Sequence, residues 1–185
     1  MTWALSLLLN NKEASRRSSK NSDTQIGKDR QVNQSDLNNL PYLHTVIKET
    51  LRLYPAAPLS LPHEAMEDCN VSRFLTTHKD IDVRGQNFEL IPIGSGRRMC
   101  ARSSLAFQVV GLALTSFLHA FDVQTSGDGV VDMEEAVGLI NLKATPLEVL
   151  PTPRVPGHVY NECGITNHRV TCLPKTFGQT NHSIS

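Results

Sequence analysis

The sequence predicts a mainly α protein with small β elements. Apolar residues recur at helical spacing over 41–54 and again over 103–120, which indicates two amphipathic helices. Between 121 and 150, short apolar segments flank a turn at Gly127-Asp128-Gly129, which indicates short strands. The 185 residues are enough for one domain of ordinary size.

The elements expected before residue 71 differ in how clearly they are marked. Residues 1–14 are predicted to be the end of a helix. Residues 15–39 are polar, which predicts a loop or a weak helix and makes this stretch a candidate for disorder. Pro41 suits a first helical turn, and Pro55 stops the helix predicted over 41–54. The proline-containing stretch 55–70 is expected to be extended, with one strand as a candidate.

The helix predicted over 103–120 contains Gly111, which weakens a helix by about 1 kcal/mol relative to alanine. The strands expected after it are FDVQT, LINLKAT and LEVLP. One side of the helix collects Leu105, Val109, Leu112, Ala113, Ser116 and Phe117.

Composition excludes several classes of protein. Lys+Arg and Asp+Glu both number 18, so no bulk attraction to nucleic acid or to an anionic membrane is expected. The longest apolar run, residues 3–9, is far shorter than the roughly 20 residues of a membrane-spanning helix, so no transmembrane segment is expected. The four cysteines, at 69, 100, 163 and 172, form no regular disulfide framework.

Two short motifs carry candidate chemistry. In KETLR, Glu49 and Arg52 share a helix face, and by itself this spacing is most simply an exposed ion pair. In IGSGRRMC, glycines allow a tight turn before Cys100, and the following helix would favour its thiolate through the helix dipole. A cysteine considered alone is more simply a small, inert apolar residue.

Taken together, KETLRLYP and GSGRRMC, in this order and before a long helix, resemble the cytochrome P450 superfamily. The flanking segments NNLPYLHTVIKETLRLYP, RFLTTHKDIDVRGQNFELIPIGSGRRMC and LALTSFLHAFDV are similar to a plant microsomal member. The resemblance covers nearly all of 1–14 and 31–156, so it implies a partial P450 fold over 1–156, on the proximal, haem-loop side. Residues 157–185 are unlike the family and are expected to be a disordered tail.

The resemblance also assigns roles. Cys100 would be the axial thiolate of haem b iron, and Arg98 and His63 would reach the haem propionates, with Gly96 in the haem loop. Glu49 and Arg52 would form a buried ion-pair network with Arg73, the arginine of an R-F pair. Two segments would line the substrate site, and their residues are Ala57, Leu59, Leu61, Leu139 and Ile140.

The activity implied by the family is monooxygenation of a small apolar organic compound, a plant specialised metabolite, with O2. Electrons would come from NADPH through a flavoprotein reductase. Nucleic acid is not an expected partner. The family lies on the cytosolic face of the endoplasmic reticulum membrane; this chain shows no anchor, so a cytosolic location is expected for it.

The chain also departs from the family pattern. Ile93 stands where the haem loop has phenylalanine, and Arg102 where it has glycine, so Arg102 is expected to clash or swing out. Ser72 and Arg73 join segments that the family holds apart, which indicates an internal deletion. The oxygen-activating motif and most of the distal wall are not in the sequence, so the isolated chain is expected to be inactive.

Two other functions stay open. The tail residues His158, Cys163, His168 and Cys172 are zinc-ligand types, although their spacing lacks the usual close cysteine pair. Alternatively, the chain is a truncated, non-catalytic product that binds a partner, with Arg97, Arg98 and Arg102 facing an acidic reductase.

Overall fold

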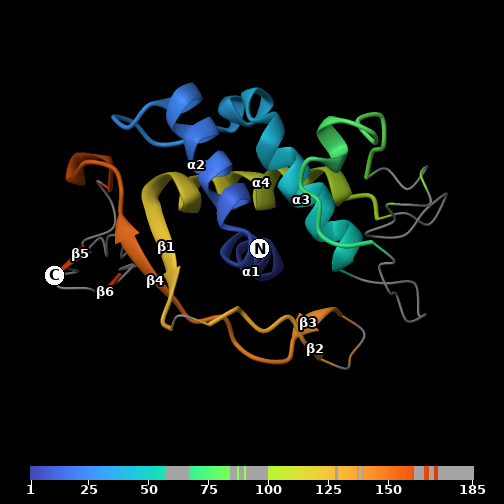
Figure 1. The fold of residues 1–185 in the computed structure, drawn as a ribbon. Helices are drawn as coiled ribbons and strands as arrows, with labels where there is room; N and C mark the ends of the chain where they lie inside the picture. Colours follow the sequence, from blue (N-terminus) through green and yellow to red (C-terminus); the bar gives the residue numbers. More distant parts are fainter. Residues whose placement is uncertain are drawn as a thin grey trace, which may run out of the picture.

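The computed structural model describes residues 1–56, 67–83, 87, 90, 100–127, 129–136, 138 and 140–160, and the backbone of 165–166 and 169–170. The helices form one group, with one strand pair at its end and another along its edge (Figure 1). In chain order the elements are α1 (Thr2–Asn10), α2 (Lys12–Ile26), η1 (Gln34–Asn39), α3 (Pro41–Leu53), η2 (Arg73–Leu75), α4 (Ser103–Ala120), β1 (Phe121–Thr125), β2 (Glu135–Ala136), β3 (Leu142–Lys143), β4 (Val149–Pro153), η4 (Gly157–Tyr160), β5 (Ile165–Thr166) and β6 (Arg169–Val170).

The polar segment 15–39 differs from its expected loop, because most of it is helical. Asn11 begins α2 by accepting a hydrogen bond from the Ala14 amide at 3.0 Å. Gly27 ends the helix with φ of 79°, a left-handed conformation that suits glycine. The buried residues of α2 recur every fourth position and are mostly small: Ala14, Ser18, Ser22 and Ile26.

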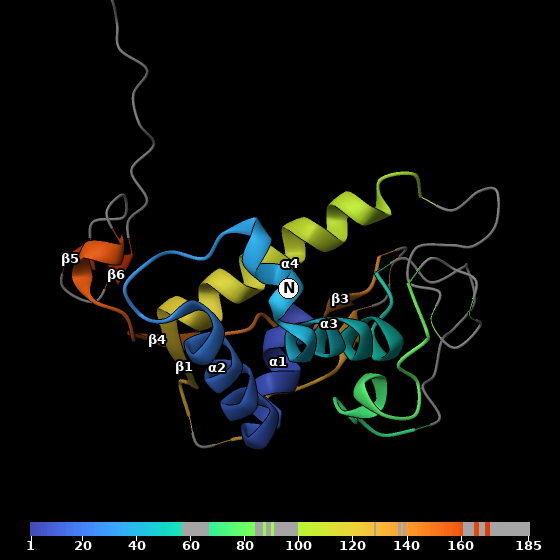
Figure 2. The ribbon, with the colours of Figure 1, turned by 90° about the horizontal axis from the view of Figure 1, so that it is seen from above.

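The two helices predicted from periodicity are present. α3 has Pro41 in its first turn and ends one residue before the predicted boundary, and α4 covers the whole of 103–120. The buried side of α4 is not the predicted one, however, since Leu105 and Val109 are 55% and 58% exposed while Leu114 and Leu118 are buried. Figure 2 shows the N-terminal turns of α4 projecting past η1, which explains that exposure.

α4 also has the length and apolar composition of a membrane span. Polar residues interrupt the helix, so it contains no long continuous apolar run. α4 contacts α2, α3 and η1, and a third of it is buried in the fold. A core helix of a folded domain meets the same two criteria.

Two antiparallel strand pairs follow α4. β1 pairs with β4, with Phe121 opposite Pro153 and Thr125 opposite Val149, and β2 pairs with β3. β1 and β3 lie within the predicted strands FDVQT and LINLKAT, and β4 overlaps the predicted strand LEVLP. β2 was not predicted. The third pair, β5–β6, lies in the tail, whose residues 171–185 are outside the described part of the chain.

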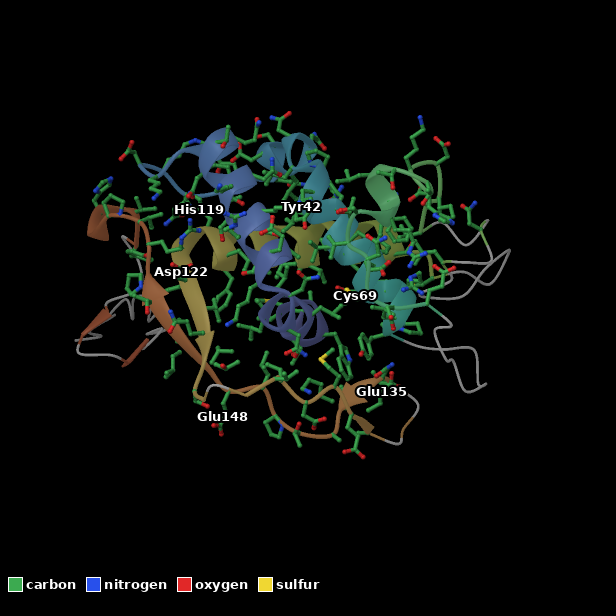
Figure 3. The ribbon with its side chains drawn as sticks, in the orientation of Figure 1. Tyr42, Cys69, His119, Asp122, Glu135 and Glu148 are labelled. Carbon is green, nitrogen blue, oxygen red and sulfur yellow. The ribbon has the colours of Figure 1, made fainter. Side chains whose placement is uncertain are left out.

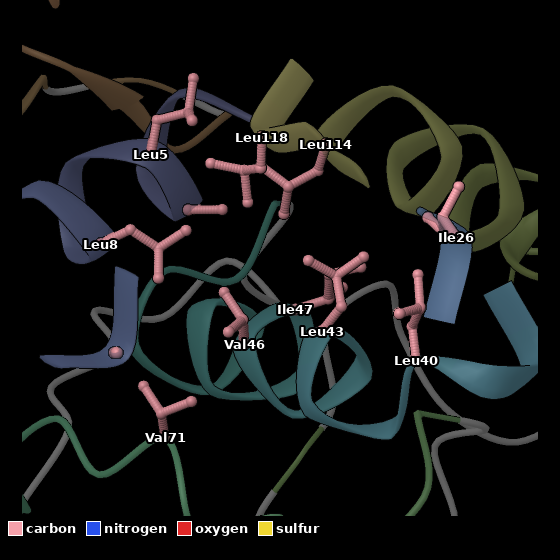
Figure 4. Close-up of a cluster of buried hydrophobic side chains, with 12 residues drawn as sticks. Leu5, Leu8, Ile26, Leu40, Leu43, Val46, Ile47, Val71, Leu114 and Leu118 are labelled. Atoms are coloured by element: carbon pink, nitrogen blue, oxygen red, sulfur yellow. The ribbon is translucent and has the colours of Figure 1, made fainter. Parts of the chain in front are cut away.

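The main core lies between the helices. It joins side chains of α1, α3 and α4, among them Leu8, Val46 and Leu114, which are at most 2% exposed (Figure 4). The end of the β1–β4 pair is tied to this core by Arg154, which donates to the Leu118 carbonyl and to Asp23, both at 2.7 Å. The β1–β4 pair is therefore fixed relative to the helices.

Candidate functional site

A buried carboxylate on α3 gathers the charged residues that the sequence singled out. Glu49 has no exposed surface, and Arg52 donates to its two oxygens at 2.8 and 3.0 Å, a bidentate pair one helical turn away. The Asn70 amide donates to Glu49 Oε1 at 2.8 Å. Arg73, at the start of η2, places its Nε 3.6 Å from Glu49 Oε2. The structure thus brings Glu49, Arg52 and Arg73 together.

The two arginines also hold the chain that precedes η2. Arg52 donates to the Glu67 carbonyl at 3.0 Å, and Arg73 donates to the Asp68 carbonyl at 3.2 Å and pairs with the Glu67 side chain. The hydrogen bonds to Glu49 raise the pKa of Arg52, and Arg73 lowers the pKa of the exposed Glu67. The cluster therefore fastens 67–73 to α3 through charge-assisted bonds.

Cys69, which no motif in the sequence singles out, lies beside α3 next to this cluster (Figure 3). It is half-buried, and removal from water, followed by the charge of Glu49, raises the pKa of its thiol. Burial of this kind makes a cysteine less reactive.

Cys100 differs from Cys69 in both exposure and position. It is exposed and lies three positions before the first residue of α4, and its carbonyl accepts a hydrogen bond from the Ser103 amide at 3.2 Å. Arg102 occupies the N-cap position without a side-chain capping bond, and its side chain is exposed, so it points outward rather than into the fold. The positive end of the α4 dipole therefore lies near Cys100.

An apolar pocket of about 170 Å³ lies between α1, α3 and α4. Small side chains border it on three sides, from Ala4 on α1, Ala56 after α3 and Ala106 on α4. Thr50 and Leu51 close it on the α3 side. A flat apolar group can approach such a wall closely, because alanine leaves only a methyl group above the backbone.

The sole tryptophan connects this pocket with a segment expected to line the substrate site. Trp3 stacks on Tyr54 at 4.0 Å between ring centroids and donates to the Asn141 carbonyl at 3.0 Å. The Asn141 amide in turn donates to the Ala56 carbonyl at 3.3 Å. Residues 140–141 and the start of the proline-containing stretch are therefore neighbours, although Ile140 itself is 60% exposed.

Most of the other sequence-predicted site residues lie outside the described part of the chain. These are Ala57, Leu59, Leu61, His63, Gly96, Arg98 and Leu139, together with Ile93 of the haem loop. Of the candidate zinc ligands, only His158 is described. The described residues contain no cluster of three or more potential metal ligands.

Comparison with known proteins gives consistent results. The sequence model described as "Cytochrome P450" matches residues 1–83 and 70–150. Xanthotoxin 5-hydroxylase of Arabidopsis thaliana is 50% identical over 189 positions, covering 84% of this chain and 36% of the relative. Flavonoid-6-hydroxylase of Ocimum basilicum is 44% identical, covering 86% and 36% respectively. The chain thus spans about a third of the length of these relatives.

The fold agrees with that assignment. A zebrafish cytochrome P450 solved with abiraterone superposes with a TM-score of 0.67 at 23% identity, covering 83% of this chain and 43% of that structure. The likeness shows that the mainly α arrangement with small sheets is part of the P450 fold. Because the family match covers most of the sequence, this chain belongs to the cytochrome P450 family.

Proposed function

We propose that residues 1–156 form the haem-loop side of a haem-thiolate monooxygenase and that Cys100 is its axial ligand. The observation that carries the proposal is the position of Cys100, exposed and three positions before Ser103, the first residue of α4. Iron is bound by the thiolate form of a cysteine. Family membership supplies the cofactor class, and the exposed position of Cys100 leaves its sulfur accessible to haem iron.

The described residues fit one edge of a haem site. Ala4 and Ala106 present small apolar surfaces from α1 and α4, as a planar macrocycle requires. At about 170 Å³ the pocket is smaller than the roughly 300–1,000 Å³ of sites that enclose an organic ligand, so it would form one wall. Arg98 and His63 stay the predicted propionate partners, with Gly96 in the loop. When bound, haem supplies oxygen activation, which the electron push of a thiolate ligand favours.

The Glu49 cluster has a positioning role in this proposal. It fixes 67–73 on one face of α3, while Thr50 and Leu51 of the same helix border the apolar pocket. α3 is thereby held in place by charge on one side and presents apolar residues on the other. Loss of the cluster would displace the pocket wall along with the helix.

The substrate class follows from the relatives. Two of them are named for hydroxylation of xanthotoxin and of a flavonoid, both small, largely apolar plant compounds. We propose hydroxylation of a compound of this kind, with O2 as the oxygen source and electrons from NADPH through a flavoprotein reductase. The substrate-lining residues would be Ala57, Leu59, Leu61, Leu139 and Ile140, and the working location the cytosolic face of the endoplasmic reticulum.

An internal deletion at Ser72/Arg73 belongs to the same proposal. The two family matches overlap at 70–83, around this junction. The alignment with the xanthotoxin 5-hydroxylase has 189 positions, although it includes only 84% of the 185 residues of this chain. Some of its positions must therefore be gaps in this chain, opposite residues that the relative has. Sequencing the transcript and the gene tests this, because a shortened exon or an altered splice site should coincide with Ser72/Arg73.

Haem titration followed by absorption spectroscopy tests the ligand assignment. We expect residues 1–185 to bind ferric haem with a thiolate spectrum that is lost in Cys100→Ser and kept in Cys69→Ser. We expect no product when reductase, NADPH and an apolar substrate are added to this polypeptide. An unchanged spectrum in Cys100→Ser would refute the ligand assignment, and NADPH-dependent product would refute the expected inactivity.

A further inference from the structure

A long groove lies beside β1, at the end of the fold away from Cys100. Its volume is about 740 Å³, within the roughly 300–1,000 Å³ of clefts that hold an organic ligand. One wall is formed by α2 and the end of α1, and the other by β1 and the turn after it. Cys100 precedes the N-terminus of α4 and β1 follows its C-terminus, so the length of this 18-residue helix, about 27 Å, separates the groove from Cys100.

The groove follows one edge of β1. Among the described strands β1 pairs only with β4, which lies on one side of it, whereas α1 and α2 lie on the other (Figure 1, Figure 2). The four consecutive residues 122–125 line the groove, and no residue of β4 does. Consecutive side chains of a strand point to opposite faces, so a groove that touches four in a row runs along the strand's edge. This is the edge of β1 that faces away from β4.

The backbone of Val123 is directed toward this edge. The Arg154 amide donates to the Ala120 carbonyl at 2.9 Å. Hydrogen-bonded and non-bonded pairs alternate along antiparallel strands, so Val123, three positions later, is in a non-bonded pair with Pro151, which has no N–H. The N–H and C=O of Val123 therefore point away from β4, and no described residue forms a hydrogen bond with them there.

The two outer edges of this strand pair differ. Pro151 and Pro153 stand in β4 at the positions whose N–H groups would otherwise face outward. Prolines at such positions protect an edge from pairing with another chain, because they cannot donate a hydrogen bond to it. The sequence of β1, FDVQT, contains no proline. An unprotected row of N–H and C=O groups can add an extended peptide as a further strand.

The charge of the α2 wall indicates which peptide would fit. Lys12, Arg16 and Lys20 line the groove four residues apart, so this basic row lies along one side of the helix at intervals of about 6 Å. Alternate side chains of an extended strand are about 6.6 Å apart, so acidic residues at every second position of a peptide would match the basic row. Arg16 also pairs with the exposed Glu13, but the Lys12 and Lys20 ammonium groups have no partner among the described residues.

Contacts at both ends of the groove hold its two walls together. At one end Arg154 donates to Asp23 at 2.7 Å, and its Nε lies 3.9 Å from Asp122. At the other end Asn10 exchanges two hydrogen bonds with Val131, at 2.8 and 2.9 Å. The two carboxylates that line the groove are therefore beside an arginine at one end, and the basic row between the ends keeps its positive charge.

We propose that this groove binds an extended acidic segment of a partner protein, which adds to β1 as a third strand. The Val123 N–H and C=O would bond to the backbone of that segment, and its acidic side chains would face the basic row. A second copy of this chain fits less well, since pairing β1 with β1 would bring two basic rows together. The proposal needs neither haem nor Cys100, so it stands apart from the monooxygenase assignment.

The test is titration of the full 185-residue chain into a fluorescein-labelled hexapeptide, Glu-Val-Glu-Val-Glu-Val, followed by fluorescence anisotropy. Binding is expected, and it should weaken as salt is added, because exposed charge pairs are screened. The same hexapeptide with methylated backbone amides keeps its charges but cannot donate to β1, so it should not bind. The hexapeptide Lys-Val-Lys-Val-Lys-Val should not bind either, because its charge is opposite.

Variants of the chain separate the two contributions. Lys12→Met/Lys20→Met is expected to weaken binding about two- to thirtyfold, the usual effect of losing two exposed charge pairs. Lys28→Met/Lys79→Met is the matched control, since it removes the same charge outside the groove, and it should bind like the parent chain. Val123→Pro should abolish binding, because the edge loses its donor. Circular dichroism confirms that each variant is folded, and the methylated hexapeptide carries the test if Val123→Pro is not.

Three results would overturn the proposal: no binding of the acidic hexapeptide by the parent chain, equal binding of the methylated one, or equal affinities of Lys12→Met/Lys20→Met and its control. Analytical ultracentrifugation tests the other occupant. A dimer of the parent chain that Val123→Pro converts to a monomer would assign the groove to a second copy, and would overturn the proposal as well.

Discussion

Replacing Glu49 by alanine is expected to lower the free energy of unfolding by about 3–5 kcal/mol, the usual loss when one partner of a buried charge cluster is removed. Its carboxylate has no exposed surface and accepts three hydrogen bonds of 3.0 Å or less. The side chains of Arg52 and Arg73 are each only 12% exposed, so without Glu49 two guanidinium groups lose their main buried counter-charge. Small domains are stable by about 5–15 kcal/mol, so this loss is a large share of the total.

Urea denaturation followed by circular dichroism measures the effect. Glu13→Ala is the matched control, since Glu13 also pairs with two arginines, Arg16 and Arg17, but its side chain is 51% exposed. That variant should change stability little, because solvent screens exposed pairs. Glu49→Gln, which keeps the shape and one acceptor oxygen, should fall between the two. Equal urea midpoints for Glu49→Ala and Glu13→Ala would refute the reasoning.

Three further predictions concern single positions. Hydrogen bonds from Arg30 lower the pKa of Asp36 to about 2, so its contribution to stability is present above the unfolded pKa of about 4 and is lost as pH falls toward 2. Melting temperatures at pH 5 and pH 2 should therefore differ less in Asp36→Asn than in the parent chain. Gly111→Ala should raise the free energy of unfolding by about 0.5–1 kcal/mol in urea titrations, since the added methyl meets only ordinary contacts at 3.7 Å or more. Leu114→Ala should cost about 2–5 kcal/mol while Leu105→Ala changes stability little, and similar losses would contradict the observed orientation of α4.

The sequence was informative where a helix has one apolar side and clear end signals. α3 has both, with Pro41 at its start and Pro55 after its end, and it was predicted to within one residue. α4 is apolar almost all round, so its limits were predictable but its buried side was not. That side depends on where η1 and α3 lie, which no local pattern within α4 records.

α2 shows the opposite problem. Its serines and its one asparagine favour turns in isolation, so the segment is predicted as loop or weak helix. A signal was nevertheless present, since Ala14, Ser18, Ser22 and Ile26 recur every four residues and are the buried positions. Because serine is not an apolar residue, the pattern of apolar residues does not reveal this four-residue period. Tertiary packing, rather than propensity, accounts for the helix.

For the candidate site, the sequence identified residue types but not their partners. The proximity of Glu49 to Arg73, 24 positions later, was inferred from family resemblance and not from spacing, and the structure places them 3.6 Å apart. The environment of Cys69 could not have been inferred, because it is formed in part by Glu49 and Arg52 on α3. Local patterns specify elements, whereas burial and pairing arise only when the elements pack.

The environment of Trp3 makes its fluorescence a probe of the local structure. As the only tryptophan in the chain, it alone determines the fluorescence excited at long wavelength. It is 8% exposed, stacked on Tyr54, bonded to the Asn141 carbonyl and overlain by the Lys143 ammonium at 5.2 Å. Its emission maximum and quenching therefore monitor one junction, where α1, the end of α3 and the segment before β3 meet. Opening of the wall beside the apolar pocket would shift that emission to the red even while the rest of the fold stays intact.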